Sequence, residues 1–160
     1  VLQAIFDKHV PEVEARRHAM LDEYEARGEP DLRALSSALV RPLAAKLDDA
    51  DGGREFLQIY SELIEKPQQP EVAKDTAGSL QRWRDMLEPL LDEDAVRLHR
   101  RFTAILHTTL ELGRRARTRK RADDRLFTSY LIDVVTAILA APVSEETKRL
   151  AAERDRKRRS

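Results

Sequence analysis

The sequence predicts an all-α fold. Five residue types that favour helices, Ala, Glu, Lys, Leu and Arg, account for 85 of the 160 residues. Apolar residues recur at spacings of three and four along most of the chain, which is the pattern of an amphipathic helix. No segment alternates apolar and polar residues between turn signals, as a half-buried strand would. We therefore expect a helical bundle of about seven helices, forming one domain over residues 1–160.

The first predicted helix covers residues 1–27. Its apolar positions begin at Val1 and Leu2 with no N-cap residue before them, so we expect residue 1 to lie at or inside a helix that starts upstream. Pro11 predicts a kink, because proline removes a backbone donor and crowds the preceding turn. Gly28 suits the left-handed cap that ends a helix.

The middle of the chain predicts three more helices, which prolines and glycines separate. Residues 31–50 carry leucines at spacings of three and four, and Pro42 predicts a second kink or a break there. Residues 54–66 and 71–88 repeat the apolar pattern, and Pro89 is expected to end or bend the latter.

The last three predicted helices cover residues 93–116, 124–141 and 145–156. The helix over 124–141 differs from the others, because Asp133 is its only charged residue after Arg125. Its apolar surface is wider than one stripe, so we expect burial on more than one side. It is either the central helix of the domain or a helix that joins residues 93–116 in a two-fold, four-helix contact between two subunits.

Composition and motifs exclude several classes of protein. The absence of cysteine excludes disulfides, a thiolate nucleophile and Cys-ligated zinc. No apolar run approaches the roughly 18 residues of a membrane helix. The balance of 29 basic and 29 acidic residues argues against a protein that binds nucleic acid over its whole surface. No catalytic motif is present and the four histidines are not spaced as metal ligands, so we expect no enzyme, cofactor or metal.

Aromatic side chains suggest a small-molecule pocket. They fall on the apolar faces of three consecutive predicted helices, which indicates either ordinary core packing or the wall of a pocket for a hydrophobic or aromatic molecule. His107 is more typical of a core histidine than of a ligand contact. The residues expected at the pocket are Phe56, Tyr60, Trp83, Met86, Phe102, His107 and Thr108.

Two basic stretches, Arg114–Arg121 and Arg154–Arg159, could contact phosphate. Neither contains aromatic residues for base stacking, and both lie at predicted helix ends, where cations suit the helix dipole. A solvated helix end is the favoured interpretation. Binding of nucleic acid through Arg114–Arg121 is an alternative.

Six loosely patterned stretches follow one another along nearly the whole chain: Val1–His9, Leu35–Ala44, Gly52–Pro67, Leu80–Leu91, Asp94–Gly113 and Leu126–Ser144. Their order and spacing resemble the C-terminal regulatory region of TetR-family transcriptional regulators. The resemblance implies an effector pocket between the helices and a DNA-binding helix-turn-helix domain preceding residue 1. It also implies that Asp94–Gly113 and Leu126–Ala141 form the dimer bundle, with Leu126, Tyr130, Val134 and Ile138 at the interface.

The function implied by this resemblance is that of a ligand-responsive transcriptional regulator, by family expectation a repressor. It would be a cytoplasmic homodimer that binds a small hydrophobic or aromatic effector, reaches operator DNA only through the other domain and has no membrane partner. An effector would act by favouring a different spacing of the two DNA-binding heads. A helical scaffold or adaptor without a small-molecule ligand is the alternative.

Overall fold

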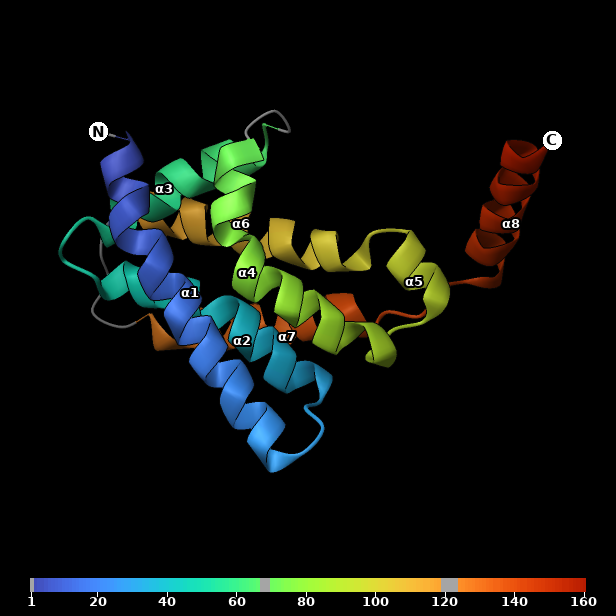
Figure 1. The fold of residues 1–160 in the computed structure, drawn as a ribbon, viewed down its shortest axis with the longest axis horizontal. Coiled ribbons are helices and arrows are strands. Elements are labelled where there is room, and N and C mark those ends of the chain that lie inside the picture. The colour runs from blue at the N-terminus through green and yellow to red at the C-terminus, as the bar shows by residue number, and fades with distance from the viewer. Residues whose placement is uncertain (1, 67–69, 119–123) are drawn as a thin grey trace.

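Helices account for all the regular secondary structure that the computed structural model places in its described residues, 2–66, 70–118 and 124–160. The all-α prediction is therefore confirmed. Figure 1 shows the α-helices α1 (Leu2–Arg27), α2 (Leu32–Ala44), α3 (Gly53–Ile64), α4 (Pro70–Leu87), α5 (Glu93–Arg97), α6 (Arg100–Arg117), α7 (Arg125–Ala140) and α8 (Glu145–Arg159). Two short 3-10 helices, η1 (Ala45–Asp48) and η2 (Glu88–Leu90), extend α2 and α4.

The helix boundaries differ from the predicted ones in two ways. The helix expected over residues 93–116 is divided at His99, whose left-handed backbone (φ 63°) ends α5 and begins α6. Helix α1 continues through Pro11 over the range predicted for it, whereas α2, where Pro42 predicted a kink or a break, continues through that proline to Ala44 before it tightens into η1.

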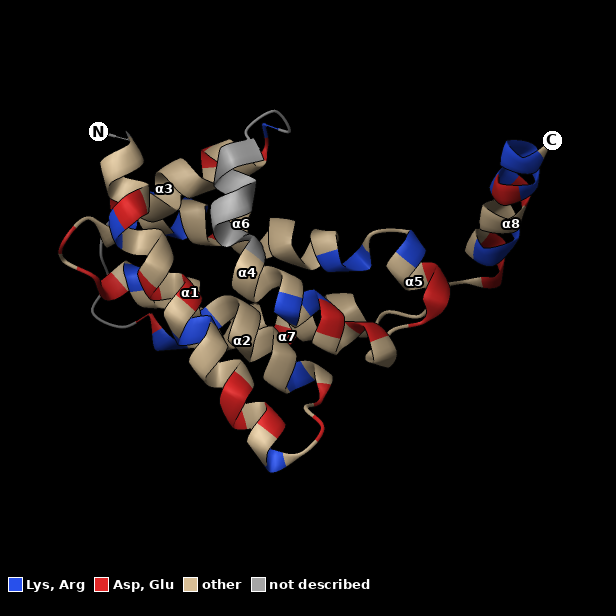
Figure 2. Ribbon diagram, viewed as in Figure 1, with Lys and Arg blue, Asp and Glu red and all other residues tan. Residues whose placement is uncertain are grey.

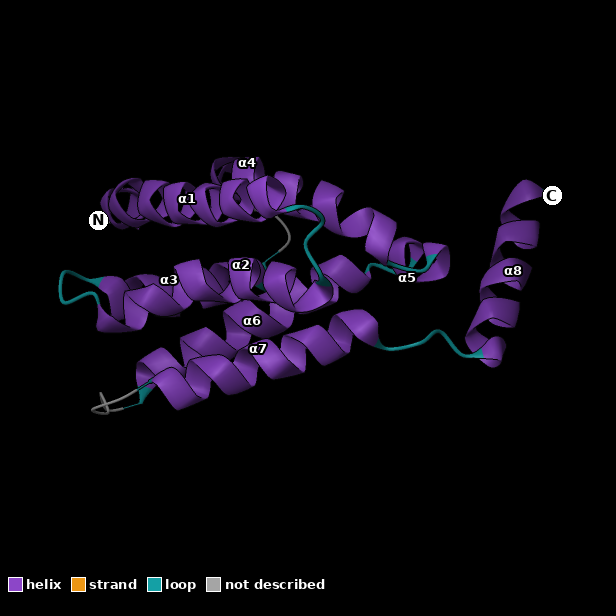
Figure 3. Ribbon diagram, turned by 90° about the horizontal axis from the view of Figure 1, so that it is seen from below, coloured by secondary structure: helices purple, strands orange, loops and turns teal. Residues whose placement is uncertain are grey.

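The helices form three layers, with α2 at the centre (Figure 3). Helices α1 and α4 cover one side of α2 and α3, while α6 and α7 lie on the other. Helix α2 contacts α1, α4, α6 and α7. The residues that it buries are Leu35, Ser36, Ala38, Leu39, Val40, Pro42, Leu43 and Ala44. The central helix is thus α2 and not α7.

Two side chains from the α1 and α4 layer donate hydrogen bonds to backbone carbonyls of α2. The buried guanidinium of Arg17 donates from Nε to the Ala38 carbonyl (3.0 Å) and from Nη2 to that of Leu39 (3.2 Å). The indole Nε1 of Trp83 donates to the Leu35 carbonyl (2.8 Å). Pro42 has no N–H to offer Ala38, so Arg17 supplies the hydrogen bond that the proline removes.

Helices α3 and α6 approach closely at Gly113. A Cβ atom at this position would lie 2.1 Å from Ser61 Oγ and 2.3 Å from Ser61 Cβ. The absence of a side chain at Gly113 therefore sets the distance between the two helices.

Helix α8 projects away from the other helices and contains no buried residue (Figure 1). Ser144 caps its N-terminus by accepting a hydrogen bond from the Thr147 N–H (3.1 Å). Two long ion pairs connect it to α5 and its N-cap residue, Arg97–Asp155 at 3.6 Å and Lys148–Asp92 at 4.0 Å.

Among the described residues, no single helix has both the length and the apolar character needed to cross a membrane. The bent pair of α7 and α8 passes that test by length and composition only.

Candidate functional site

An aromatic cluster brings two of the predicted pocket residues together. Phe56 and Tyr60 of α3 have ring centroids 5.5 Å apart, and Phe6 of α1 lies edge-on to Phe56 at 5.8 Å. The ring of His9 stacks on that of Phe56, with ring centroids 5.2 Å apart. All four side chains are buried, so contacts between aromatic rings join α1 to α3.

The two predicted pocket residues on α4 contribute to the core of the protein. Trp83 is fully buried, and its indole N–H is already used by the Leu35 carbonyl. Met86 is partly buried against the hydrophobic core. The polar tip of Trp83 is therefore committed to the backbone of α2 rather than offered to a ligand.

The three predicted pocket residues on α6 lie in different environments. Thr108 is fully buried, and its hydroxyl has no hydrogen-bond partner among the described residues; the neighbouring Thr109 hydroxyl shares this property. His107 is half-buried. Phe102, near the start of α6, is 43% exposed and lies outside the aromatic cluster.

A hollow of about 250 Å³ lies elsewhere, where the end of α7 meets α2, η2 and α5. Its wall includes Leu32, Leu91, Ala95, Leu139 and Val143, and none of the predicted pocket residues lines it. Arg100 also borders it and donates to the carbonyls of Ile138 (3.1 Å) and Ala141 (2.6 Å), at the C-terminal end of α7. That guanidinium is satisfied by the helix terminus.

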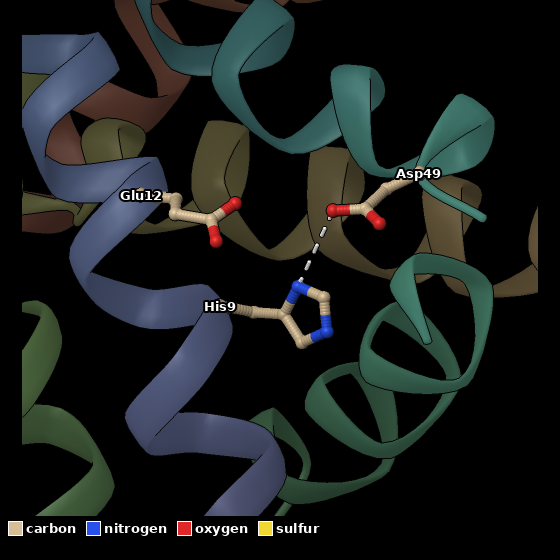
Figure 4. A group of neighbouring side chains, drawn as sticks. All are labelled: His9, Glu12 and Asp49. Atoms are coloured by element: carbon tan, nitrogen blue, oxygen red, sulfur yellow. Dashed lines mark ion pairs between the residues drawn. The ribbon is translucent and has the colours of Figure 1, made fainter. Parts of the chain in front are cut away.

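A polar cluster, which the sequence did not predict, joins α1 to the end of η1 (Figure 4). His9 and Glu12 lie one turn apart on α1, and His9 Nδ1 faces Asp49 Oδ2 at 3.7 Å. The buried ammonium of Lys46 contacts Glu12 at 2.5 Å and Asp49 at 3.1 Å. His9 and Glu12 have a visible i, i+3 spacing, but nothing in the sequence indicates that Lys46 is buried beside them.

The electrostatics of this cluster follow from Lys46. Its hydrogen bond lowers the pKa of both the Glu12 and the Asp49 carboxyl. Burial lowers the pKa of His9, and the positive charge of Lys46 adds to that effect. The imidazole is therefore favoured in its neutral form, and its Nδ1 is buried without a hydrogen bond.

The same three side chains could hold a divalent cation, because a ligand atom from each lies within 4.8 Å of the others. One imidazole nitrogen and two carboxylate oxygens suit metals such as Zn²⁺ or Mn²⁺. The Lys46 ammonium, however, already neutralises both carboxylates. In this arrangement Lys46 is the cation of the site, and a metal would have to displace it.

The cluster predicts a specific pH dependence of stability. Between about pH 7.5 and about pH 5.5, the unfolded chain takes up a proton at His9 more readily than the folded protein, whose His9 pKa lies below 6.5. The free energy of unfolding should therefore decrease as the pH is lowered through this window. The decrease should be smaller for the His9→Gln variant. Loss of the Glu12 and Asp49 contribution begins at lower pH, near their ordinary carboxyl values. Urea unfolding at both pH values tests this, with His107→Gln as control; an unchanged slope for His9→Gln would contradict it.

The residues predicted at the dimer interface differ in exposure along α7. Leu126 and Tyr130, in its first half, are 81% and 67% exposed. Val134 is half-buried, and Ile138 packs partly against the core. The opposite side of α7 is buried through Leu131, Ile132, Val135 and Leu139.

Three arginines of the basic stretch at the end of α6 have carboxylate neighbours. Arg114 pairs with Glu111, Arg117 with Glu62, and Arg115 with the buried Asp124 at 2.7 Å. Residues 119–121 of that stretch lie outside the described residues. The described arginines thus have roles within the fold. At the other basic stretch, the last turn of α8 carries exposed cations at the tip of the helix.

Comparison with known proteins gives no match. No family profile, no curated protein and no solved structure is similar enough to this chain to be reported.

Proposed function

We propose that this chain is the effector-binding and dimerisation region of a TetR-like transcriptional regulator. In this proposal it acts in the cytoplasm as a homodimer and represses transcription through a DNA-binding domain outside the sequence. The observation that carries the proposal is the exposure of Leu126 (81%) and Tyr130 (67%), two large apolar side chains on α7.

An apolar face of this kind supports association with a second subunit. Leu126 and Tyr130 lie one turn apart, so their side chains share one side of α7, and Asp133 one turn further on is paired with Arg33 of α2 at 2.5 Å. Large contiguous apolar patches are rare on monomers, because their exposure to water is unfavourable. A two-fold contact through this face would bury it in both subunits at once.

The effector would enter among α1, α3 and α6 in this proposal. Phe6, Phe56 and Tyr60 supply an apolar and aromatic wall. The Thr108 hydroxyl is a buried polar group without a partner among the described residues, as expected of a group that completes its hydrogen bonding with a ligand. An effector that prefers one arrangement of α1 over another would shift the population of dimers toward that arrangement.

Light scattering on the purified chain tests the proposal through the Tyr130→Asp variant. The unmodified chain is expected to be a dimer at tens of micromolar, and Tyr130→Asp is expected to weaken that dimer by about a hundredfold or more, because it buries a charge in the interface. The matched control is Ala19→Asp, at an exposed position on α1, in the layer opposite α7.

The outcomes separate the alternatives. A strict monomer would remove the basis of the proposal. A dimer that Tyr130→Asp leaves intact would mean that another face mediates association. In both variants, circular dichroism should remain that of a helical protein, which shows that the substitutions act on association and not on folding.

A further inference from the structure

The imidazole of His9 has a buried nitrogen that no described residue satisfies. His9 is 1% exposed, and its Nδ1 atom is buried without a hydrogen bond among the described residues. This nitrogen faces Asp49 Oδ2 at 3.7 Å, which is too long for a hydrogen bond. A buried polar atom without a partner is unfavourable unless a water, an ion or another ligand completes its bonding. The orphaned nitrogen therefore points to a ligand between α1 and the end of η1.

Two carboxylates complete a set of metal ligands around this nitrogen. One oxygen each from Glu12 and Asp49 and one nitrogen of His9 lie within 4.8 Å of one another, and Figure 4 shows the three side chains turned toward one another. Ligand atoms about 2.0–2.2 Å from a tetrahedral Zn²⁺ lie about 3.3–3.6 Å apart. The 3.7 Å between His9 Nδ1 and Asp49 Oδ2 is already close to that spacing. Side-chain rotation over about 1 Å closes the remainder.

The backbone orients these ligands. His9 and Glu12 are three residues apart on α1, so their side chains share one face of the helix. Asp49 follows η1 directly, and its Oδ1 atom accepts a hydrogen bond from the Asp51 N–H (2.9 Å). A carboxylate that is held through one oxygen presents the other to a metal, as supporting hydrogen bonds do around metal ligands. Asp49 therefore directs Oδ2 toward His9.

Lys46 satisfies only part of this set. Its ammonium contacts Glu12 Oε2 at 2.5 Å and Asp49 Oδ2 at 3.1 Å, yet His9 Nδ1 remains without a hydrogen bond. One ammonium beside two carboxylates also leaves one negative charge in the cluster. A divalent cation in its place would neutralise both carboxylates and bind the imidazole nitrogen as well.

The surroundings favour exchange of the lysine for a metal. The Glu12 side chain is 53% exposed, so the cluster reaches solvent on that side, and the flexible stem of Lys46 can turn outward there. The loop that follows η1 is acidic, as Figure 2 shows. Lys8, next to His9 in the sequence, is paired with Asp51 on that loop.

We propose that His9, Glu12 and Asp49 form a binding site for Zn²⁺, in which the metal replaces the ammonium of Lys46. The fourth position of the tetrahedron is left to water, as in zinc sites with three protein ligands. Mg²⁺ is a poor occupant, because it prefers ligand sets made of oxygen alone. The set contains a single histidine, so the spacing between histidines that led us to expect no metal does not bear on it. The inference is independent of the dimer and of the proposed effector pocket.

Isothermal titration of the purified chain with ZnCl₂ at constant pH tests the site. One Zn²⁺ per chain is expected, and His9→Gln should weaken binding by about a hundredfold, because it removes the only nitrogen ligand. Lys46→Gln should strengthen binding by about tenfold or more, since it removes the competing cation. A lysine with a purely structural role would give no gain in Zn²⁺ affinity when it is replaced.

The matched control is His18→Gln. His18 also lies near a carboxylate one turn away, Glu14 at 3.9 Å, but its side chain is 41% exposed. Its replacement should leave the Zn²⁺ affinity unchanged, and titration of the unmodified chain with MgCl₂ should give no saturable binding. Nitrogen-15 spectra of the histidine rings should show that Zn²⁺ shifts the Nδ1 signal that is missing from His9→Gln. This spectrum and Lys46→Gln test the site even if His9→Gln does not fold.

Three outcomes would overturn the proposal. Zn²⁺ binding that His18→Gln abolishes and His9→Gln leaves intact would place the metal at the exposed histidine. Absence of binding both in the unmodified chain and in Lys46→Gln would exclude the ligand set. Binding that appears only in Lys46→Gln would show that the ammonium is not exchangeable, so that the unmodified protein has no metal site.

Discussion

Replacing Arg17 with Met is expected to lower the free energy of unfolding by about 2–4 kcal/mol. The guanidinium is buried and donates to Ala38, Leu39 and the Ser79 hydroxyl, so its loss leaves three buried acceptors without that donor. The Ala38 carbonyl is affected most, because Pro42 cannot donate to it. Removing a buried cation recovers part of its desolvation cost, which keeps the expected loss below the sum of the separate hydrogen bonds.

Urea unfolding followed by circular dichroism measures this change, with Arg16→Met as the matched control. Arg16 is exposed on the adjacent position of α1, so its replacement should alter stability by no more than about 0.5 kcal/mol. Equal effects at the two positions would mean that the hydrogen bonds of Arg17 contribute nothing specific to the fold.

Replacing Gly113 with Ala is expected to destabilise the protein by about 1–3 kcal/mol. In the middle of an isolated helix the same change stabilises by about 1 kcal/mol, so the sign itself is informative. The added Cβ atom at residue 113 would lie 2.3 Å from the Cβ atom of Ser61. Two Cβ atoms on packed helices cannot be separated by side-chain rotation. The helices α3 and α6 would have to separate.

The double variant Gly113→Ala with Ser61→Gly separates this clash from other effects. Removing the Ser61 side chain should recover most of the loss caused by Gly113→Ala, giving a favourable coupling energy in a double-mutant cycle. Thermal or urea unfolding of the four proteins provides the measurement. Additive effects would show that the two side chains do not determine the spacing of the helices.

The helical elements were predictable because each depends on a local pattern of apolar residues. The left-handed residue His99 was not, since neither glycine nor proline marks that break between α5 and α6. The continuity of α2 through Pro42 was not predictable either. In α2 the acceptor that Pro42 leaves open is satisfied by Arg17, which is 21 residues away from Ala38 in the sequence.

The candidate sites depend on tertiary contacts in the same way. Phe56 and Tyr60 lie close together because they are one turn apart on a single helix. Whether Trp83 and Phe102 join them depends on how three helices are arranged, which their local patterns do not specify. The burial of Lys46 beside Glu12 joins residues 34 positions apart, and a lone lysine in the sequence indicates only a solvated charge.

The two polar contacts from α1 to the α2–η1 segment restrict how α1 can move. Glu12 is held by Lys46, and Arg17 is held by the carbonyls of Ala38 and Leu39. Glu12 and Arg17 are five positions apart, which corresponds to about 7.5 Å along the helix axis. A rod attached at two points can neither slide along its length nor turn about a perpendicular through either attachment. The rigid-body motion of α1 that leaves both contacts in place is a rotation about the line through them, and any other displacement must break one of the contacts or carry the α2–η1 segment with it.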